Sequence, residues 1–292
     1  MSCPSPQEWQ QAGHYLRYSG LKTFSRLNIF GISRGSGRPV LVLHGFPTAS
    51  FDFSQLTPLL EEQYRLIMFD YPGFGFSDKP ARYPYSLFRY ADVAQSVATY
   101  YGLQQVYLLA HDIGDSVALE LLRRGYPTIK KLILLNGSIF SIPLDDYKML
   151  LLQKLLLHPI NGPILSKLAV LGKPIFSRMF PKIFYNPLPK RDIEAFWTLL
   201  RYNKGTANYH RLIRYMVERW EHQAMWLDVL AAHPADLALI WGQGDPVATP
   251  AVADHVLQLR PDAAYFRLDD VGHYPHWEAP AQVATLVQQV FG

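Results

Sequence analysis

Short apolar runs alternate with longer stretches of helical periodicity along most of the chain. Runs of five to seven residues rich in Val, Ile and Leu are typical of parallel strands covered by helices on both faces. The predicted parallel strands are residues 40–44, 65–71, 105–111, 131–136, 237–241 and 264–268. The predicted helices are residues 53–61, 88–101, 114–124, 251–259 and 281–291. This order indicates βαβ units around one sheet of the α/β class.

Two earlier segments alternate more regularly between polar and apolar positions. They are residues 14–18 and 27–32, and Gly31, Gly35 and Gly37 supply turns. Such strands suit antiparallel pairing at the edge of a sheet, where one face meets water. The sequence therefore predicts a mostly parallel sheet of eight strands.

The strand pattern stops near residue 139 and returns only after about residue 225. Helical stretches replace it, and they are interrupted by prolines, which a helix interior does not accept. These prolines are Pro143, Pro159, Pro163, Pro174, Pro181, Pro187 and Pro189. We predict a helical cap at residues 138–225, inserted after the sixth strand, between core segments 1–137 and 226–292.

The predicted cap carries the positive charge of the chain. Residues 138–225 hold 13 Lys and Arg against 6 Asp and Glu, whereas the remainder holds 15 against 18. A basic apolar segment is compatible with peripheral contact to an anionic membrane. Solvated lysines on a helical cover are the commoner explanation of such a segment.

Composition narrows the class of protein. With 292 residues, 49% of them hydrophobic, the chain can bury a large core in one domain. Cys3 is the only cysteine, which excludes an internal disulfide and a thiolate zinc site. The first fifteen residues lack the pattern of a secretory signal, and no apolar run reaches the roughly 20 residues of a membrane span. We therefore expect a cytoplasmic location.

One strand-to-helix junction has the pattern of a strained turn that exposes a nucleophile. Residues 106–118 indicate a buried strand, a sharp turn at Asp112 and a helix. Ala110 and Gly114 are small, as the close approach of the helix beneath such a turn requires. Asp115 stands where Gly or Ala is common. The alternative is an ordinary loop in which Asp112 caps the helix.

Later loops supply groups that would serve such a nucleophile. Asp245 follows a predicted strand in a Gly-rich turn, and His273 lies in the loop after the last strand. Phe46 follows the first parallel strand, so its backbone N–H could join that of Ile113 in an oxyanion hole. The alternative for each is a turn or surface residue without a catalytic role.

No metal or cofactor motif stands out. His276 lies three residues from His273, but no His-Glu-x-x-His helix accompanies the pair, and Pro275 argues against a regular helix between them. We interpret His276 as structural. The chain also lacks the Gly-rich sequences that bind dinucleotides or nucleotide phosphates. We therefore expect no metal, no cofactor and no nucleic-acid partner.

These segments together resemble the α/β-hydrolase group of epoxide hydrolases and haloalkane dehalogenases, from about residue 27 onward. The residues that carry the resemblance are His44-Gly45-Phe46-Pro47, Asp70-Tyr71-Pro72-Gly73-Phe74-Gly75-Phe76-Ser77-Asp78, His111-Asp112-x-Gly114, Gly244-Asp245 and Gly272-His273-x-x-x-x-Glu278-x-Pro280. Residues 111–118, 135–140 and 150–156 look most like the mesoderm-specific transcript proteins and their bacterial relatives. The resemblance implies the α/β-hydrolase fold with its helical cap.

The resemblance implies Asp112 as nucleophile, His273 as general base and Asp245 as the acid that orients it. A carboxylate suits displacement at a saturated carbon, because an anhydride formed at an ester carbonyl simply expels it again. Water deprotonated by His273 would open the resulting alkyl ester, with the oxyanion held by the N–H groups of Phe46 and Ile113. We expect an epoxide-hydrolase-like enzyme acting on a small or medium apolar substrate.

Assistance to the leaving group distinguishes the subclasses. Haloalkane dehalogenases resemble one another in a Trp after the nucleophile that binds halide, and Ile113 has no side-chain donor. Epoxide hydrolases use cap tyrosines, which here are Tyr147, Tyr185, Tyr202, Tyr209 and Tyr215. Tyr209 and Tyr215 are the better candidates, although the alignment could equally place His210 there. Most tyrosines on a helical cover are packing residues.

Two other hypotheses stay open. Haloalkane dehalogenation, or another displacement that forms an ester, would require a halide donor from the cap, such as Trp197, Trp220 or Trp226. A binding or signalling protein could also keep the fold without turnover, because fold does not fix function.

Overall fold

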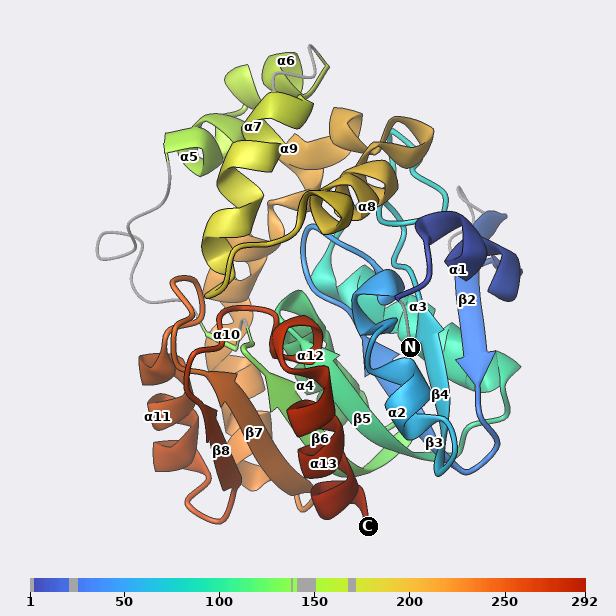
Figure 1. Cartoon of the computed structure of the whole chain (residues 1–292), viewed down its shortest axis with the longest axis vertical. Helices are drawn as coiled ribbons and strands as arrows, with labels where there is room; N and C mark the ends of the chain where they lie inside the picture. The colour runs from blue at the N-terminus through green and yellow to red at the C-terminus, as the bar shows by residue number, and fades with distance from the viewer. Residues whose placement is uncertain (1–2, 21–25, 138, 141–150, 168–171) are drawn as a thin grey trace.

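One eight-stranded sheet forms the centre of the molecule (Figure 1). The computed structural model describes residues 3–20, 26–137, 139–140, 151–167 and 172–292. The strands are β1 (His14–Tyr18), β2 (Leu27–Arg34), β3 (Arg38–Leu43), β4 (Tyr64–Phe69), β5 (Gln105–His111), β6 (Thr128–Leu135), β7 (Asp236–Gly242) and β8 (Ala264–Leu268). Their order across the sheet is β1-β2-β4-β3-β5-β6-β7-β8.

The pairing of the strands confirms the predicted mostly parallel sheet. β2 is antiparallel to β1 and β4, whereas β3 is parallel to β4 and β5, and β5 to β8 are parallel in succession. Successive side chains of a strand point to opposite faces, so Val40 and Val42 pack in one hydrophobic cluster while Leu41 and Leu43 pack in the other. Burial on both faces explains why these strands are continuous apolar runs.

The helices of the core cover both faces of the sheet. They are α1 (Pro6–Ala12), α2 (Thr57–Leu60), α3 (Leu87–Tyr100), α4 (Ile113–Arg124), α11 (Pro250–Leu259), α12 (Pro275–Glu278) and α13 (Pro280–Phe291). The predicted helix 53–61 is divided into a 3₁₀ turn, η2 (Ser50–Phe53), and α2. The short helices α1 and α12 were not predicted. Pro275 begins α12, because a helix tolerates proline in its first turn, where the missing N–H has no partner to lose.

The segment between β6 and β7 is helical throughout the residues that the structure describes. Its elements are α5 (Leu151–Leu157), α6 (Asn161–Lys167), α7 (Lys173–Met179), η3 (Phe180–Ile183), α8 (Lys190–Arg201), η4 (Tyr202–Asn208), α9 (Tyr209–Leu212) and α10 (Tyr215–Ala232). Figure 1 shows α5 to α9 gathered over one end of the sheet. This arrangement agrees with the helical cap inserted after the sixth strand. No described helix is long and apolar enough to cross a membrane.

Helix α10 connects the cap to the core without interruption. It spans Tyr215–Ala232, so the predicted boundary at residues 225 and 226 falls inside it. Trp226 and Leu230 in its second half are fully buried, and α10 packs on α4 and α3. The indole N–H of Trp226 donates to the Glu120 carboxylate of α4 at 2.9 Å. The last cap helix is therefore also a structural element of the core.

Candidate active site

Asp112 occupies the turn between β5 and α4 in a conformation that few residues other than glycine adopt. Its φ is 51° and its ψ is −116°, as at the first central residue of a type II′ turn, which is usually glycine. Its side chain makes no capping bond to α4. Instead, the backbone N–H of Phe46 donates to Asp112 Oδ2 at 2.8 Å. The turn therefore presents the carboxylate to the loop after β3 and not to the helix that follows.

Small residues around this turn allow close backbone approach. A Cβ atom on Gly114 would lie 2.5 Å from the carbonyl oxygen of Leu43, and one on Gly45 would lie 2.9 Å from Asp112 Cβ. Asp115, in the first turn of α4, is fully buried, and burial together with the charge of Asp112 raises its pKa well above the usual range. The departure from the small-residue pattern thus places a buried carboxyl group with a raised pKa in the first turn after Asp112.

His273 and Asp245 are paired at the ends of β7 and β8. His273 Nδ1 lies 2.7 Å from Asp245 Oδ2, and both side chains are buried. Asn136, just after β6, donates through Nδ2 to the same carboxylate oxygen at 2.8 Å. The backbone N–H of Val247 donates to Asp245 Oδ1 at 2.7 Å. These donors fix the carboxylate and, through it, the orientation of the imidazole.

Asn136 was not singled out by the sequence analysis as a site residue. Its φ is 38°, and its Oδ1 accepts the N–H of Gly242 at 2.7 Å, which joins the ends of β6 and β7. A polar residue directly after a buried apolar strand is the signal that could have identified it, because the carboxyl ends of parallel strands meet at one edge of the sheet.

The electrostatic surroundings of His273 favour its protonated form. Burial disfavours the imidazolium, but the adjacent Asp245 and the charge of Asp112 outweigh this effect and raise the pKa of His273 above its usual value. Since Asp245 engages Nδ1, Nε2 is the nitrogen left for proton transfer. The arrangement can therefore accept a proton from water and hold it.

Phe46 and Ile113 are the two residues whose backbone N–H groups we expect to form an oxyanion hole. Phe46 follows β3, and its N–H already contacts Oδ2 of Asp112. Ile113 is the first residue of α4, where the N–H groups have no partner within the helix and carry the positive end of the helix dipole. Two such N–H groups suit a negative oxygen that develops on the carboxylate.

Asp112 and His273 line one cavity of about 210 Å³ between core and cap. Most of the cap residues around it are apolar: Phe176, Met179, Phe180, Ile183, Leu200 and Ile213. The polar cap residues that line it are Gln153, Tyr209, Tyr215 and Arg219. The cavity thus suits a small molecule that is mainly apolar and offers a few hydrogen-bond acceptors.

Two of the three leaving-group candidates reach this cavity. Tyr209 and Tyr215 line it, and their rings pack against Phe46 with centroid separations of 5.5 and 5.4 Å. His210 is not among the described lining residues, and its backbone N–H donates to the Ser166 hydroxyl.

The other aromatic candidates lie elsewhere. Tyr185 and Tyr202 are absent from the described lining of the cavity, and Tyr147 falls outside the described residues. Trp197, Trp220 and Trp226 are also absent from that lining.

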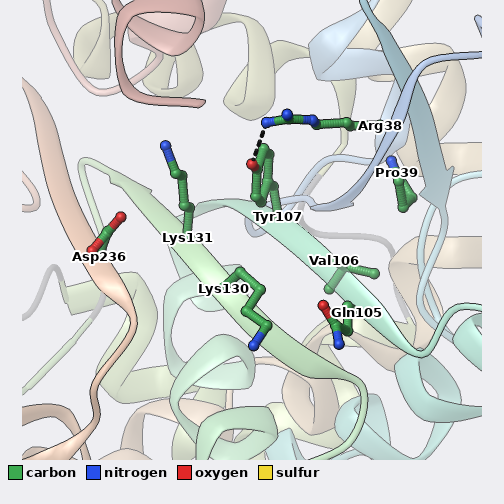
Figure 2. A pocket seen from close by; sticks show the side chains of 8 residues that line it. All are labelled: Arg38, Pro39, Gln105, Val106, Tyr107, Lys130, Lys131 and Asp236. Carbon is green, nitrogen blue, oxygen red and sulfur yellow. Dashed lines mark hydrogen bonds between the residues drawn. The ribbon is translucent and has the colours of Figure 1, made fainter. Parts of the chain in front are cut away.

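A second hollow of about 420 Å³ lies at the amino ends of the central strands, and Figure 2 shows the side chains that line it. It is bordered by the first residues of β3, β5 and β7, which are Arg38, Gln105 and Asp236, and by Lys130 and Lys131 of β6. Open α/β sheets bind ligands at the carboxyl ends of their strands, and this hollow lies at the amino ends. Its described lining holds no histidine.

Comparison with known proteins agrees with this geometry. The sequence profile of a family described as the alpha/beta hydrolase fold matches residues 38–280. The LipZ protein of Mycobacterium tuberculosis is 37% identical over 291 residues, covering 97% of each chain. The mesoderm-specific transcript protein of Mus musculus is 34% identical over 291 residues, covering 95% of this chain and 85% of that protein.

Solved structures show the same fold at low sequence identity. The epoxide hydrolase CorEH superposes with a TM-score of 0.76 at 18% identity, covering 96% of this chain and 98% of that chain. The haloalkane dehalogenase DatA from Agrobacterium tumefaciens superposes with a TM-score of 0.80 at 18% identity, covering 95% and 96% of the two chains.

Proposed function

Because the chain belongs to the alpha/beta hydrolase fold family, we propose that it is a hydrolase whose nucleophile is Asp112 and that it opens epoxides through a covalent alkyl-enzyme ester. The observation that carries the proposal is the strained turn at Asp112, whose carboxylate accepts the N–H of Phe46 instead of capping α4. Such conformations persist only where the surrounding structure enforces them, and strained residues cluster at functional sites.

In the first step, one carboxylate oxygen of Asp112 attacks an epoxide carbon. A new C–O bond forms while the epoxide C–O bond breaks, and its electron pair goes to the departing oxygen. Tyr209 or Tyr215 donates a proton to that oxygen. Burial raises the pKa of Tyr209, which keeps the phenol protonated, and Tyr209 lines the cavity that contains Asp112.

In the second step, His273 Nε2 takes a proton from water while the water oxygen attacks the ester carbonyl of Asp112. The N–H groups of Phe46 and Ile113 stabilise the oxyanion of the tetrahedral intermediate. The ester C–O bond then breaks, the imidazolium supplies a proton to the departing alkoxide, and a diol leaves. Asp112 emerges as a carboxylic acid, and its proton returns through solvent to the tyrosinate formed in the first step, which restores both groups. Asp245 stabilises the imidazolium in between, since its carboxylate lies 2.7 Å from Nδ1.

Dehalogenation has less support from the same cavity. The indole N–H of Trp226 is engaged by Glu120, and Trp197 packs against Phe176 with a centroid separation of 5.5 Å. Neither indole, nor that of Trp220, is among the described residues lining the cavity that contains Asp112.

The test is a panel of epoxides and haloalkanes, with the wild type and His273→Gln examined by intact-mass measurement and peptide mapping. The variant should accumulate an ester on Asp112, because ester formation continues while ester hydrolysis loses its base. An epoxide adds its whole mass to the protein, whereas a haloalkane adds its mass minus that of the hydrogen halide. Asp112→Asn is the matched control and should acquire no adduct.

A single turnover of the wild type in H₂¹⁸O provides an independent readout. Through the ester, the label enters the Asp112 carboxylate, and the first diol formed carries unlabelled oxygen. Label in the first product, or an adduct on another residue such as Ser116, contradicts the nucleophile assignment. Tyr209→Phe and Tyr215→Phe should slow adduct formation by about 10²-fold or more if both donate, whereas Tyr185→Phe, outside the cavity, should not.

A further inference from the structure

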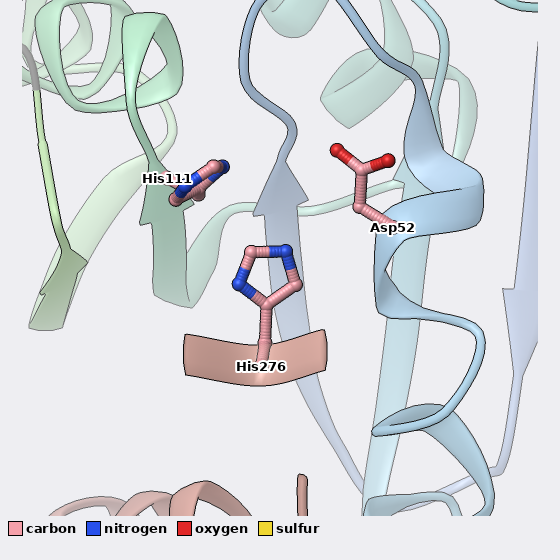
Figure 3. A group of neighbouring side chains, drawn as sticks. All are labelled: Asp52, His111 and His276. Carbon is pink, nitrogen blue, oxygen red and sulfur yellow. The ribbon is translucent and has the colours of Figure 1, made fainter. Parts of the chain in front are cut away.

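Three potential metal ligands converge in the interior of the molecule (Figure 3). They are Asp52 of η2, His111 at the end of β5 and His276 of α12. All three side chains are fully buried, and one ligand atom from each lies within 4.8 Å of the other two. The three residues belong to separate segments of the chain that the sheet topology brings together.

The polar atoms of this cluster have few partners within the described structure. Asp52 Oδ1, His111 Nδ1 and both ring nitrogens of His276 make no hydrogen bond. Buried polar atoms in folded proteins nearly always have a partner, and each one without a partner requires an explanation. A set of converging lone pairs suits a cation better than it suits further side chains.

We propose that Asp52, His111 and His276 bind a divalent transition-metal ion, and that their donor set selects Zn²⁺. Two imidazole nitrogens with one carboxylate oxygen are a ligand combination that Zn²⁺ accepts, and imidazole does not suit Mg²⁺ or Ca²⁺. From the sequence, His273 was the only candidate partner of His276 in a metal pair. In the structure, His273 is paired with Asp245, and His276 faces two residues far away in the chain.

Hydrogen bonds outside the cluster orient its ligands. His111 Nε2 lies 2.8 Å from the carbonyl oxygen of His273, which can only accept, so Nε2 carries the proton and Nδ1 keeps its lone pair. The hydroxyl of Thr48 donates to Asp52 Oδ2, which leaves Oδ1 toward the cluster. Burial lowers the pKa of both imidazoles, that of His111 to about 3, so both are in the neutral form that ligates a metal.

The charge around the cluster also favours a cation. Burial, together with the charges of Asp70 and Asp112, raises the pKa of Asp52 well above its usual range. A divalent ion that takes the place of the Asp52 proton would relieve this repulsion in a buried region, where screening by water is weak. In a tetrahedral zinc site the ligand atoms are about 3.3 Å apart, and here they lie within 4.8 Å of one another, so their separations would have to shorten by up to about 1.5 Å on binding.

The ion would join the three segments that carry the candidate catalytic groups. Asp52 lies six residues after Phe46, His111 directly precedes Asp112, and His276 follows His273 by three residues. None of the three ligands is among the described residues that line the cavity. The role of the ion is to fix the positions of the segments that carry Phe46, Asp112 and His273 relative to one another, and not to contact substrate.

The test measures metal content in the whole protein, produced without a polyhistidine tag. Because the ligands are fully buried, the ion must enter as the chain folds, so cells are grown in minimal medium supplemented with Zn²⁺ or, separately, with Co²⁺. The wild type should contain about one equivalent of either metal, and its Co²⁺ form should absorb in the visible range as a low-symmetry site does. His276→Gln and Asp52→Asn should retain less than about a tenth of that metal.

His255→Gln, which changes a histidine of α11 outside the cluster, is the matched control and should keep the full metal content. Circular dichroism and size-exclusion chromatography establish that each variant is folded, and either cluster variant suffices if the other fails to fold. A wild type with less than a tenth of an equivalent overturns the proposal, and so does equal metal content in the wild type and a folded cluster variant. The outcome is independent of the proposed catalytic function, because no substrate is used.

Discussion

Replacing Asp112 with glycine should leave the protein more stable than replacing it with alanine. At ordinary positions the opposite holds, because glycine loses more backbone freedom on folding. At Asp112 the backbone has φ 51° and ψ −116°, which strains any residue that has a Cβ atom. Both variants lose the same carboxylate and the same hydrogen bond from Phe46. Their difference in stability therefore isolates the backbone strain of the turn.

The magnitude follows from two opposing contributions. A residue held in a sparsely populated backbone conformation costs about 1–3 kcal/mol. Glycine also lowers the free energy of unfolding by about 0.5–1 kcal/mol relative to alanine, because it gives the unfolded chain more conformational entropy. We therefore expect Asp112→Gly to exceed Asp112→Ala by roughly 0.5–2 kcal/mol in the free energy of unfolding.

The assay is urea unfolding followed by circular dichroism, with all variants measured at one pH. Thr285 supplies the matched pair, because it is exposed in the middle of α13. At this position the free energy of unfolding should be about 1 kcal/mol higher for Thr285→Ala than for Thr285→Gly. If alanine is also the better replacement at Asp112, the turn is not strained, and the argument that assigns it a functional role fails.

Two further predictions concern the catalytic histidine and the join between cap and core. Asp245 raises the pKa of His273 above 6.5, and only the neutral ring is a base, so ester hydrolysis should be lost as the pH falls through that raised value. Asp245→Asn should move this acidic limb of the pH–rate profile to lower pH. A limb that does not move would exclude His273 as the base. Trp226→Phe removes the bond to the buried Glu120 carboxylate and should lower the free energy of unfolding in urea by about 1–3 kcal/mol, whereas Trp220→Phe, as the control, should change it far less.

The elements closest to the site could be predicted from local sequence. The parallel strands are continuous apolar runs because both of their faces are buried, and the eight-stranded sheet is confirmed. The turn at Asp112 was recognisable because close packing of α4 demands small residues at Gly114 and Ala110. The expected resemblance to the mesoderm-specific transcript proteins is confirmed as well. These features depend on short stretches of chain whose own chemistry carries the information.

Contacts between distant segments could not be predicted in the same way. Asn136 supports Asp245 across 109 positions of the chain, and Asp52 meets His111 and His276 only after β3, β5 and α12 are in place. Pro275 begins the unpredicted helix α12, because proline is accepted in a first turn, but no regular helix joins His273 to His276, as expected. Such relations are set by strand order and register, which periodicity along a single sequence does not encode.

The continuity of α10 has a consequence for engineering this protein by domain exchange. A chimaera that took residues 138–225 from a relative would splice foreign sequence into the middle of an 18-residue helix, one position before Trp226. The foreign first half of α10 would then have to continue, in the same orientation, into a second half that is already held by the hydrogen bond between Trp226 and Glu120. A crossover point beyond Ala232, in the short connection to β7, transplants the cap together with its own anchor.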